Sequence, residues 1–234
     1  MRNYIILNGI SSLTIPGLLI QNLPPISKPK QRVQVEEIDG RDGDIITYLG
    51  YGAYDKQFKI GLYGSYNVDE IIEYFNSQGI VIFSNEEDKY YNYQIIEQID
   101  FDRLLRFKEA TVKMHIQPFK YSAEDNQKMF TISDTTHINI RNSGNIYSRP
   151  VLIIEGSGSI DLYLNGNQLF AIDMGDYTSI TIDTNNMNAY NGSTLLNRNV
   201  SGSYDNFKLN VGNNTISWSG AITQIEIDNY SRWI

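Results

Sequence analysis

Histidine and cysteine, two of the residue types most used in catalytic and metal sites, are rare in this sequence. It contains two histidines, His115 and His137, and no cysteine. Neither histidine has a partner at the HxxxH or HxH spacing from which a zinc site is built. No GxSxG, Walker or GxGxxG motif occurs, so acyl transfer, nucleotide hydrolysis and dinucleotide redox chemistry lack their usual residues. We therefore predict that both histidines are structural and that the chain binds no metal or cofactor.

One run of carboxylates could suggest a cation-binding site. Asp39, Asp42 and Asp44 are close together in the sequence, and carboxylate oxygens are the ligands that Ca²⁺ prefers. The twelfth position of an EF-type loop that starts at Asp39 is Gly50, which has no side chain to act as the bidentate ligand. The sequence therefore predicts no calcium site.

A second carboxylate pair raises the possibility of glycoside hydrolysis. Asp161 and Asp173 could face each other across a hairpin, as the two carboxyl groups of a glycosidase do. Such pairs also arise by chance in any acidic β protein. We therefore predict no catalytic residue and no enzymatic activity, with a glycosidase as a minor alternative.

The run Asp39–Gly43, DGRDG, predicts a tight turn between two strands. Gly40 and Gly43 can adopt the positive φ that a reversal requires, and the apolar residues on both sides recur at every second position, as in half-buried strands. Arg41 lies at the apex, where its guanidinium can pair with a carboxylate across a strand or a subunit boundary. We take Gly40, Arg41, Asp42 and Gly43 as candidate interface residues; a turn that serves only its own chain is the alternative.

Aromatic residues alternate with glycine just after this strand pair, in Tyr48–Tyr54. A bulged strand or an arm that reaches a neighbouring subunit is the favoured interpretation, because tyrosine commonly anchors protein interfaces. A ligand platform is the alternative. Tyr51 and Tyr54 therefore join the interface candidates.

Length and composition predict two mainly-β domains. The 234 residues, with 12% aromatic residues and 18 glycines, suit strands with frequent turns. The lack of cysteine is compatible with folding in a reducing cytosol, and no apolar run is long enough to span a membrane. The formal charge of −8 argues against general binding to nucleic-acid phosphates. A polar stretch after residue 118 predicts the linker, which divides the chain into domains 1–130 and 131–234.

The first half predicts a β-sandwich or split barrel with one helix. Asn67 can cap a helix over Val68–Gln78 that Gly79 ends. The acidic run Asn85–Asp88 is expected to be a solvated hairpin tip. Strands are expected at 4–7, 31–38, 46–48, 56–62, 79–83, 90–96 and 107–117, with 13–20 as the continuation or partner of the first.

The second half predicts a β-sandwich of seven or eight short strands. Alternating apolar residues flank Asn165–Gly166, a strong hairpin signal, and further strands are expected at 138–140, 151–154, 160–164, 170–172, 180–182, 207–211, 216–218 and 222–227. Such a number of short strands is typical of a sandwich. Four aromatic residues could stack on sugar rings or belong to the core: Tyr163, Tyr177, Trp218 and Trp233.

The order of these features resembles the distal tail protein (Dit) of long-tailed phages that infect Gram-positive bacteria. The resemblance covers nearly the whole chain and lies in order and spacing rather than in a catalytic fingerprint. Its features are a strand ending in Asn8–Gly9, a proline-containing segment, the Gly40–Gly43 turn, the strand Lys56–Leu62, the run Pro118–Tyr121, the run Asn142–Asn145 with Arg149–Pro150, and Gly212–Asn214 before Ile216.

This resemblance implies an architectural role. It implies an N-terminal domain that assembles as a homohexameric ring and a C-terminal galectin-like, jelly-roll sandwich. The ring would lie in the virion tail, assembled in the host cytoplasm, between the major tail tube protein and the tail-tip protein, with receptor-binding proteins as further possible partners. DNA would pass through its open channel without specific binding, and no membrane is involved. The rival function is a carbohydrate-binding module that engages cell-wall glycans through the second half.

Overall fold

The computed structural model describes residues 2–75, 78–123, 127–133, 135–228 and 230–234. The chain forms two compact units, Met1–Ala123 with Ile234, and Glu124–Trp233. Strands predominate in both, which confirms the predicted mainly-β fold class. The division into domains at residue 130 stays a prediction, and residues 124–126 of the expected linker lie outside the described residues. None of the described helices is long and apolar enough to cross a membrane.

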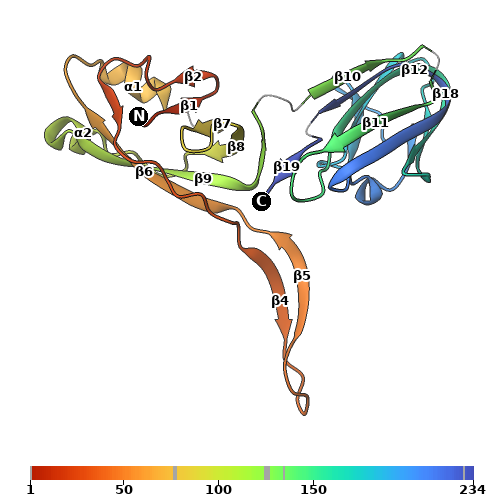
Figure 1. Cartoon of the computed structure of the whole chain (residues 1–234), viewed down its shortest axis with the longest axis horizontal. Coiled ribbons are helices and arrows are strands. Elements are labelled where there is room, and N and C mark those ends of the chain that lie inside the picture. Colours follow the sequence, from red (N-terminus) through yellow and green to blue (C-terminus); the bar gives the residue numbers. More distant parts are fainter. Residues whose placement is uncertain (1, 76–77, 124–126, 134, 229) are drawn as a thin grey trace. The chain divides into compact units, whose positions relative to one another are not determined.

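An antiparallel sheet forms the body of the first unit (Figure 1). Its strands follow the order β2-β1-β7-β8-β9-β6-β3. Alternate residues of the central pair face the core: Phe58 lies opposite Val112 and Ile60 opposite Ala110, and all four are at most 1% exposed. The strands are β1 (Ile5–Leu7), β2 (Ile10–Ser11), β3 (Leu18–Ile20), β6 (Tyr54–Leu62), β7 (Gln78–Phe83), β8 (Lys89–Gln94) and β9 (Glu109–Ser122).

Helix α1 (Val68–Tyr74) begins where the sequence predicts and ends earlier. The backbone N–H of Asp69 donates to Asn67 Oδ1 at 3.1 Å, as expected of an N-cap. The predicted end at Gln78 is wrong, because Gln78 and Gly79 pair with β8; residues 76–77 of the predicted helix lie outside the described residues.

Gly79 is not a helix stop but a point of close approach. Its φ is +149°, and a Cβ there would lie 1.8 Å from Oδ1 of Asn8. That oxygen accepts from the backbone N–H of Ile80 at 2.9 Å, and Asn8 Nδ2 donates to the Gln78 carbonyl at 3.3 Å. Glycine is therefore required where the β1–β2 turn contacts β7.

Helix α2 (Phe101–Phe107) was not predicted, so the expectation of a single helix is wrong. Asp100 caps it by accepting from the Arg103 backbone N–H at 2.8 Å, and Leu104 is its one buried residue. Lys108 then adopts a left-handed conformation, with φ of 58°, and β9 begins at Glu109. Seven residues with one buried apolar position are too few for a periodic signal.

Two strands, β4 (Gln31–Glu36) and β5 (Ile45–Tyr51), form a separate two-stranded hairpin. Figure 1 shows this β4–β5 hairpin extending away from the sheet of the first unit. Gly40 and Gly43, in the turn that joins the strands, have φ of 81° and 76°. The predicted turn and its flanking strands are confirmed.

The second unit is built around two long, bent strands. β12 (Val151–Leu164) and β18 (Gly212–Asp228) pair with each other and organise a sheet in the order β10-β18-β12-β14-β15-β16. β11 also pairs with β18, and β13 pairs with β12 and β17. The remaining elements are β10 (Gln127–Thr131), β11 (His137–Asn142), β13 (Asn167–Asp173), β14 (Ser179–Asp183), β15 (Asn188–Asn191), β16 (Thr194–Leu195), β17 (Val200–Gly202), the 3₁₀ helix η1 (Tyr204–Asn206) and β19 (Arg232–Trp233).

Two predicted strand breaks are in fact bulges. The strands expected at 151–154 and 160–164 are both part of β12, and those expected at 216–218 and 222–227 are both part of β18. A Cβ on Gly156 would lie 2.3 Å from the Ala221 carbonyl oxygen, and one on Gly220 would lie 2.4 Å from that of Ser159. These glycines therefore allow close approach of two paired backbones, without ending a strand.

The predicted strand at 207–211 is wrong. Phe207 and Leu209 are buried in the core of the second unit, but this segment makes only an isolated bridge from Leu209 to Ser148 and follows η1. The alternation of apolar residues at 207–211 thus predicted the burial of Phe207 and Leu209 correctly, but it wrongly predicted that the backbone pairs as a strand. By contrast, the predicted Asn165–Gly166 turn is confirmed, with φ of 51° and 84°.

The Gly79 contact yields a stability prediction. Gly79→Ala should lower the free energy of unfolding by about 1–3 kcal/mol, because alanine is strained at this φ and its methyl group displaces the hydrogen-bonded Asn8 side chain. Gly64→Ala is the control, since Gly64 has φ of 58° and open space around it. Urea titration of both variants measures the difference, and equal losses would contradict the close-approach argument.

Candidate assembly interface

The predicted interface turn lies at the far end of the β4–β5 hairpin. Gly40, Arg41, Asp42 and Gly43 are all exposed. The Arg41 backbone N–H donates to the Ile38 carbonyl at 3.1 Å, which closes the turn. Within the described part of the chain, no hydrogen bond or ion pair holds the Arg41 guanidinium, so it is available to a partner. The role of these four residues in an interface stays a prediction.

One face of the hairpin is apolar and uncovered. Val33 lies opposite Tyr48 and Val35 opposite Ile46, so the four side chains point to the same side of the ribbon. Their exposed fractions are 40%, 68%, 51% and 51% respectively. Monomeric proteins rarely expose contiguous apolar surface of this kind, and it commonly marks a protein–protein contact.

Charge divides the hairpin along its length. Its outer end carries five carboxylates and one guanidinium, a net formal charge of −4, whereas the segment that enters it carries three cations. The outer group is Glu36, Glu37, Asp39, Arg41, Asp42 and Asp44, which we call the acidic tip; the cations are Lys28, Lys30 and Arg32. Such a distribution favours a partner surface of positive charge at the tip.

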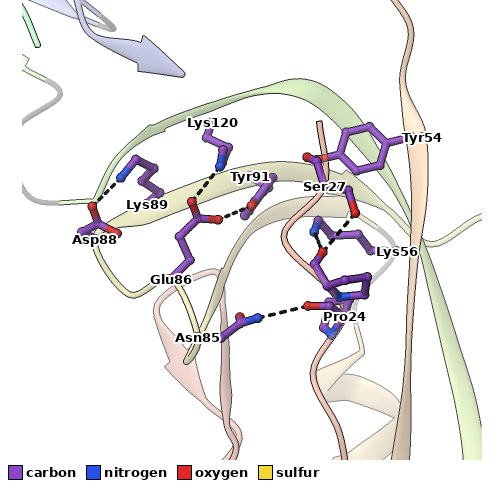
Figure 2. Close-up of polar contacts among 11 residues, drawn as sticks. Pro24, Ser27, Tyr54, Lys56, Asn85, Glu86, Asp88, Lys89, Tyr91 and Lys120 are labelled. Carbon is purple, nitrogen blue, oxygen red and sulfur yellow. Dashed lines mark hydrogen bonds and ion pairs between the residues drawn. The ribbon is translucent and has the colours of Figure 1, made fainter. Parts of the chain in front are cut away.

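A set of polar contacts holds the root of the hairpin to the body of the first unit (Figure 2). Lys56 Nζ donates to the Pro25 carbonyl at 2.6 Å, and Asn85 Nδ2 donates to the Pro24 carbonyl at 3.0 Å. Prolines have no backbone N–H to donate to a neighbouring strand, and here side chains of the body bind their carbonyls. Lys56 is only 4% exposed, with Nζ 5.1 Å from the centre of the Tyr91 ring.

A buried ion pair lies beside this contact. Lys120 Nζ is 2.7 Å from Glu86 Oε1, and the Tyr91 hydroxyl donates to the other carboxylate oxygen of Glu86. The Lys120 and Glu86 side chains are 7% and 12% exposed. The expectation that the acidic run Asn85–Asp88 is merely solvated is therefore wrong for Glu86, because its carboxylate neutralises a lysine that the sheet buries.

Burial changes the acidity of two groups at the root. Desolvation lowers the pKa of Lys56 to about 8; the Glu86 charge opposes this shift and the Lys120 charge adds to it. Desolvation also raises the pKa of Tyr54 to about 12, with a further contribution from the Glu86 charge. At neutral pH Lys56 is therefore largely protonated and Tyr54 is neutral, the forms that suit a donor to a carbonyl and a buried ring.

The two tyrosine candidates lie at the root, away from the turn. Tyr51 is half-buried and packs edge-on against Phe119, with ring centroids 5.6 Å apart. Tyr54 is also half-buried, and its hydroxyl is 3.5 Å from the Ser27 carbonyl. The structure thus places the six interface candidates at the two ends of one hairpin. The exposed face between them, Val33 with Tyr48 and Val35 with Ile46, was recognised in the sequence only as strand periodicity.

The four sugar-stacking candidates do not form one site. Trp218 lies opposite Leu162, while Tyr163 lies opposite Ser217 on the neighbouring position of the same strands. Trp218 and Tyr163 therefore face opposite sides of the sheet, and Trp218 is in the core, 6% exposed. Tyr177 is 36% exposed in the segment after β13, and Trp233 is half-buried in β19. Trp218 consequently offers no free ring face to a sugar.

The described residues include no group of three or more His, Asp or Glu side chains arranged to hold a metal. His115 Nδ1 lies 2.8 Å from Asp55 Oδ1, and His137 contacts Thr135. Both histidines thus have local protein partners.

The suspected carboxylate pair is not directly opposed. Asp161 lies across from Ala171, and Asp173 across from Ser159, so the two carboxylates are diagonal neighbours. Asp161 accepts from Gln168 at 3.1 Å and from Ser219 at 3.3 Å.

Comparison with known proteins identifies the fold. No protein-family model matches the sequence, and no curated protein matches it. Among solved structures, Dit (gp 19.1) of phage SPP1 matches with a TM-score of 0.66 and 15% identity over 100% of both chains. The chain has the Dit fold. The phage P2 baseplate in its activated conformation with Ca also matches, with a TM-score of 0.55 and 11% identity over 100% of this chain and 98% of that one. The same baseplate with Sr matches with a TM-score of 0.50 and 13% identity, over 97% and 98%.

The Dit fold sets the structural context of the β4–β5 hairpin. The alignments with SPP1 Dit and with the P2 baseplate chain in its Ca form cover the whole of this sequence. Both units and the segment that carries the hairpin therefore lie within the aligned length. The resemblance inferred from turn order and spacing is confirmed at the level of the fold.

The pKa of Lys56 yields a pH prediction. The folded chain releases this proton near pH 8, whereas an unfolded chain keeps it to about pH 10.4. Between these values the unfolded state binds more protons, so the free energy of unfolding rises with pH. From pH 7.5 to 9.5, wild-type stability should therefore rise relative to that of Lys56→Met.

Urea denaturation at several pH values measures this difference. Lys30→Met, which replaces an exposed lysine, should run parallel to the wild type. If the Lys56→Met curve is parallel as well, the buried amine does not titrate as described.

The buried ion pair yields a second prediction from this site. Glu86→Gln should lower the free energy of unfolding by about 3 kcal/mol, because it leaves the Lys120 ammonium buried without a counter-charge. Glu73→Gln, at an exposed position of α1, is the matched control and should change stability by less than about 0.5 kcal/mol. Equal effects of the two substitutions would show that Lys120 finds compensation elsewhere.

Proposed function

We propose that this chain is a structural protein of a phage tail, a distal tail hub that assembles as a homohexameric ring. The full-length match to SPP1 Dit carries the proposal, since it aligns both units and not a single common module. SPP1 Dit is a paradigm of the hub adsorption apparatus in phages that infect Gram-positive bacteria. The ring would lie in the virion tail between the tail tube and the tail tip, with an open channel for DNA.

Two features of the chain support self-association. The first is the apolar face of the β4–β5 hairpin, whose four side chains are all exposed in the single chain. The second is the set of contacts at the root, which holds the hairpin in place before any partner binds. A pre-ordered arm loses less conformational entropy on association than a flexible one. A hub whose copies must close into a ring benefits from this, because the direction of the arm sets the angle between neighbours.

The proposed role is non-catalytic. The residues that could have suggested an enzyme have local structural partners, as Asp161 and His115 show. Partners are proposed to be further copies of the chain, the tail tube protein, the tail-tip protein and receptor-binding proteins. Carbohydrate binding by the second unit is the weaker proposal, because one of its four expected platform residues, Trp218, is buried in the core.

The wild-type chain tests the proposal directly. Size-exclusion chromatography with light scattering should find a hexamer of the 26.8 kDa chain, and negative-stain electron microscopy should show rings. A particle that stays monomeric at high concentration and binds no tail component would contradict the hub. Binding to cell-wall glycans in place of ring formation would support the weaker alternative.

Substitution of the apolar face tests how the ring is held. Val35→Glu with Ile46→Glu should abolish rings, because two charges would be placed in a contact that excludes water. The fold should be unchanged, since both side chains are exposed in the single chain.

The hairpin provides its own control. Gln34 and Thr47 are directly opposite each other on the other face of the same strands. Gln34→Glu with Thr47→Glu adds the same charge at the same depth of the hairpin and should leave the rings intact. Loss of rings in both double variants would point to general charge repulsion and not to the apolar face.

A further inference from the structure

The first unit has a second exposed surface with aromatic side chains, at the end of the sheet away from the hairpin. In the β6–β9 pair, Tyr54 lies opposite Ile116 at the hairpin end and Gly61 opposite Glu109 at the other end. Helix α2 immediately precedes β9 and therefore lies at the Gly61 end. Figure 1 shows the hairpin and α2 at opposite ends of this strand pair.

Exposed cations and aromatic rings gather around α2. On the helix, Arg103, Arg106 and Phe107 have the i, i+3, i+4 spacing of residues that share a face, and Phe107 is 73% exposed. Lys108 follows, and its carbonyl accepts from the Leu62 backbone N–H at 3.3 Å, which brings Tyr63 alongside. We call this surface the α2 face; its members are Arg2, Tyr63, Arg103, Arg106, Phe107 and Lys108.

Local contacts order part of the α2 face. Arg2 donates to the Tyr63 hydroxyl at 3.0 Å and lies 5.0 Å from the centre of its ring. Lys108 Nζ donates to the Tyr66 hydroxyl at 2.6 Å. Tyr63 nevertheless remains 50% exposed. The surface thus combines four cations with two exposed aromatic rings, in a chain whose formal charge is −8.

The α2 face complements the hairpin in both charge and polarity. Its four cations are opposite in sign to the net charge of −4 on the acidic tip; the neighbouring carboxylates include Asp102 of α2 and Glu109 of β9, and Glu109 pairs with Lys59. Phe107 and Tyr63 match the apolar face of Val33, Val35, Ile46 and Tyr48. Arginine and aromatic side chains are also the residues most enriched at the energetic centres of interfaces. Because the two surfaces lie at opposite ends of one strand pair, a chain cannot join them within itself.

We propose that the α2 face of one copy receives the β4–β5 hairpin of the next copy. The acidic tip would lie against Arg103, Arg106 and Lys108, and the apolar face of the hairpin against Phe107 and Tyr63. Two different surfaces then meet at each contact, which is the heterologous arrangement that closes into rings. This inference rests on the proposed function and names the surface that the ring requires.

Charge reversal in the full chain tests the contact. Arg103→Glu with Arg106→Glu should raise the concentration at which half of the chain is in rings by about tenfold or more, because like charges would meet at the interface. Circular dichroism should be unchanged, since both side chains are exposed. Arg141→Glu with Arg198→Glu, at exposed positions of the second unit, adds the same charge and should leave assembly unchanged.

A charge-swap variant, which exchanges the charges of the two surfaces within one chain, is the decisive test of the contact. Asp42→Lys with Asp44→Lys should weaken assembly alone, and should restore it when combined in one chain with Arg103→Glu and Arg106→Glu. If the fourfold variant assembles no better than either double variant, the acidic tip does not meet the α2 face.

A cross-link gives a readout that is independent of affinity. The sequence has no cysteine, so Asp42→Cys with Arg106→Cys introduces the only thiols. Oxidation should produce covalent dimers and larger multimers, whereas Asp42→Cys with Arg198→Cys should not. Multimers from the second pair alone would overturn the assignment.

The outcomes separate this inference from the proposed function. Rings that survive Arg103→Glu with Arg106→Glu but are lost with Val35→Glu and Ile46→Glu would retain the hub and overturn the α2 face as its receiver. A strictly monomeric wild-type chain would overturn both. Binding of the hairpin to another tail protein, with the α2 face unaffected, would also overturn the inference.

Discussion

A two-stranded ribbon has no core of its own, and this constraint governs the first unit. Isolated hairpins are at best marginally stable in water, and the strands of the β4–β5 hairpin contain no buried residue. Its order must therefore come from its turn, from its ladder and from the contacts at its root. The turn uses glycine at two positive-φ positions, and the root uses side chains to hold the carbonyls of Pro24 and Pro25. The apolar side chains of Val33, Val35, Ile46 and Tyr48 remain exposed in the single chain.

The root is held by polar contacts where a packed apolar cluster would also serve for stability. Burying Lys56, Lys120 and Glu86 carries a desolvation penalty that their attraction only partly offsets. Such groups fix the orientation of the segment they hold. A hydrogen bond from a lysine to one carbonyl permits fewer relative positions of the two groups than an apolar contact does. Because the hairpin extends away from the sheet, a small change of angle at its root moves the turn at its far end by a larger distance. We therefore regard the polar root as a device that sets the angle of the hairpin at some expense of stability.

Patterns that depend on near neighbours in the sequence were predicted correctly, and those that depend on distant contacts were not. The Gly40–Gly43 turn, the Asn165–Gly166 hairpin and the Asn67 cap follow from local chemistry. Gly79 was expected to end a helix, and separate strands were expected on either side of Gly156 and of Gly220. The true role of these glycines, close approach of a distant backbone or side chain, leaves no local signal. Helix α2 was missed because only Leu104 is buried.

The same contrast between local patterns and distant contacts applies to the candidate interface. Sequence spacing located the turn and the strands of the hairpin, but not the buried partner of Glu86 or the surface around α2. Glu86 looked like one acid among several, and only the fold brings Lys120 against it. An assembly role has no compact motif of the kind that catalysis requires, because its residues are spread over complementary surfaces that never meet within one chain. A period of two and a few obligatory glycines can be met by many sequences, so the fold matches a solved structure at 15% identity although no family model matches the sequence.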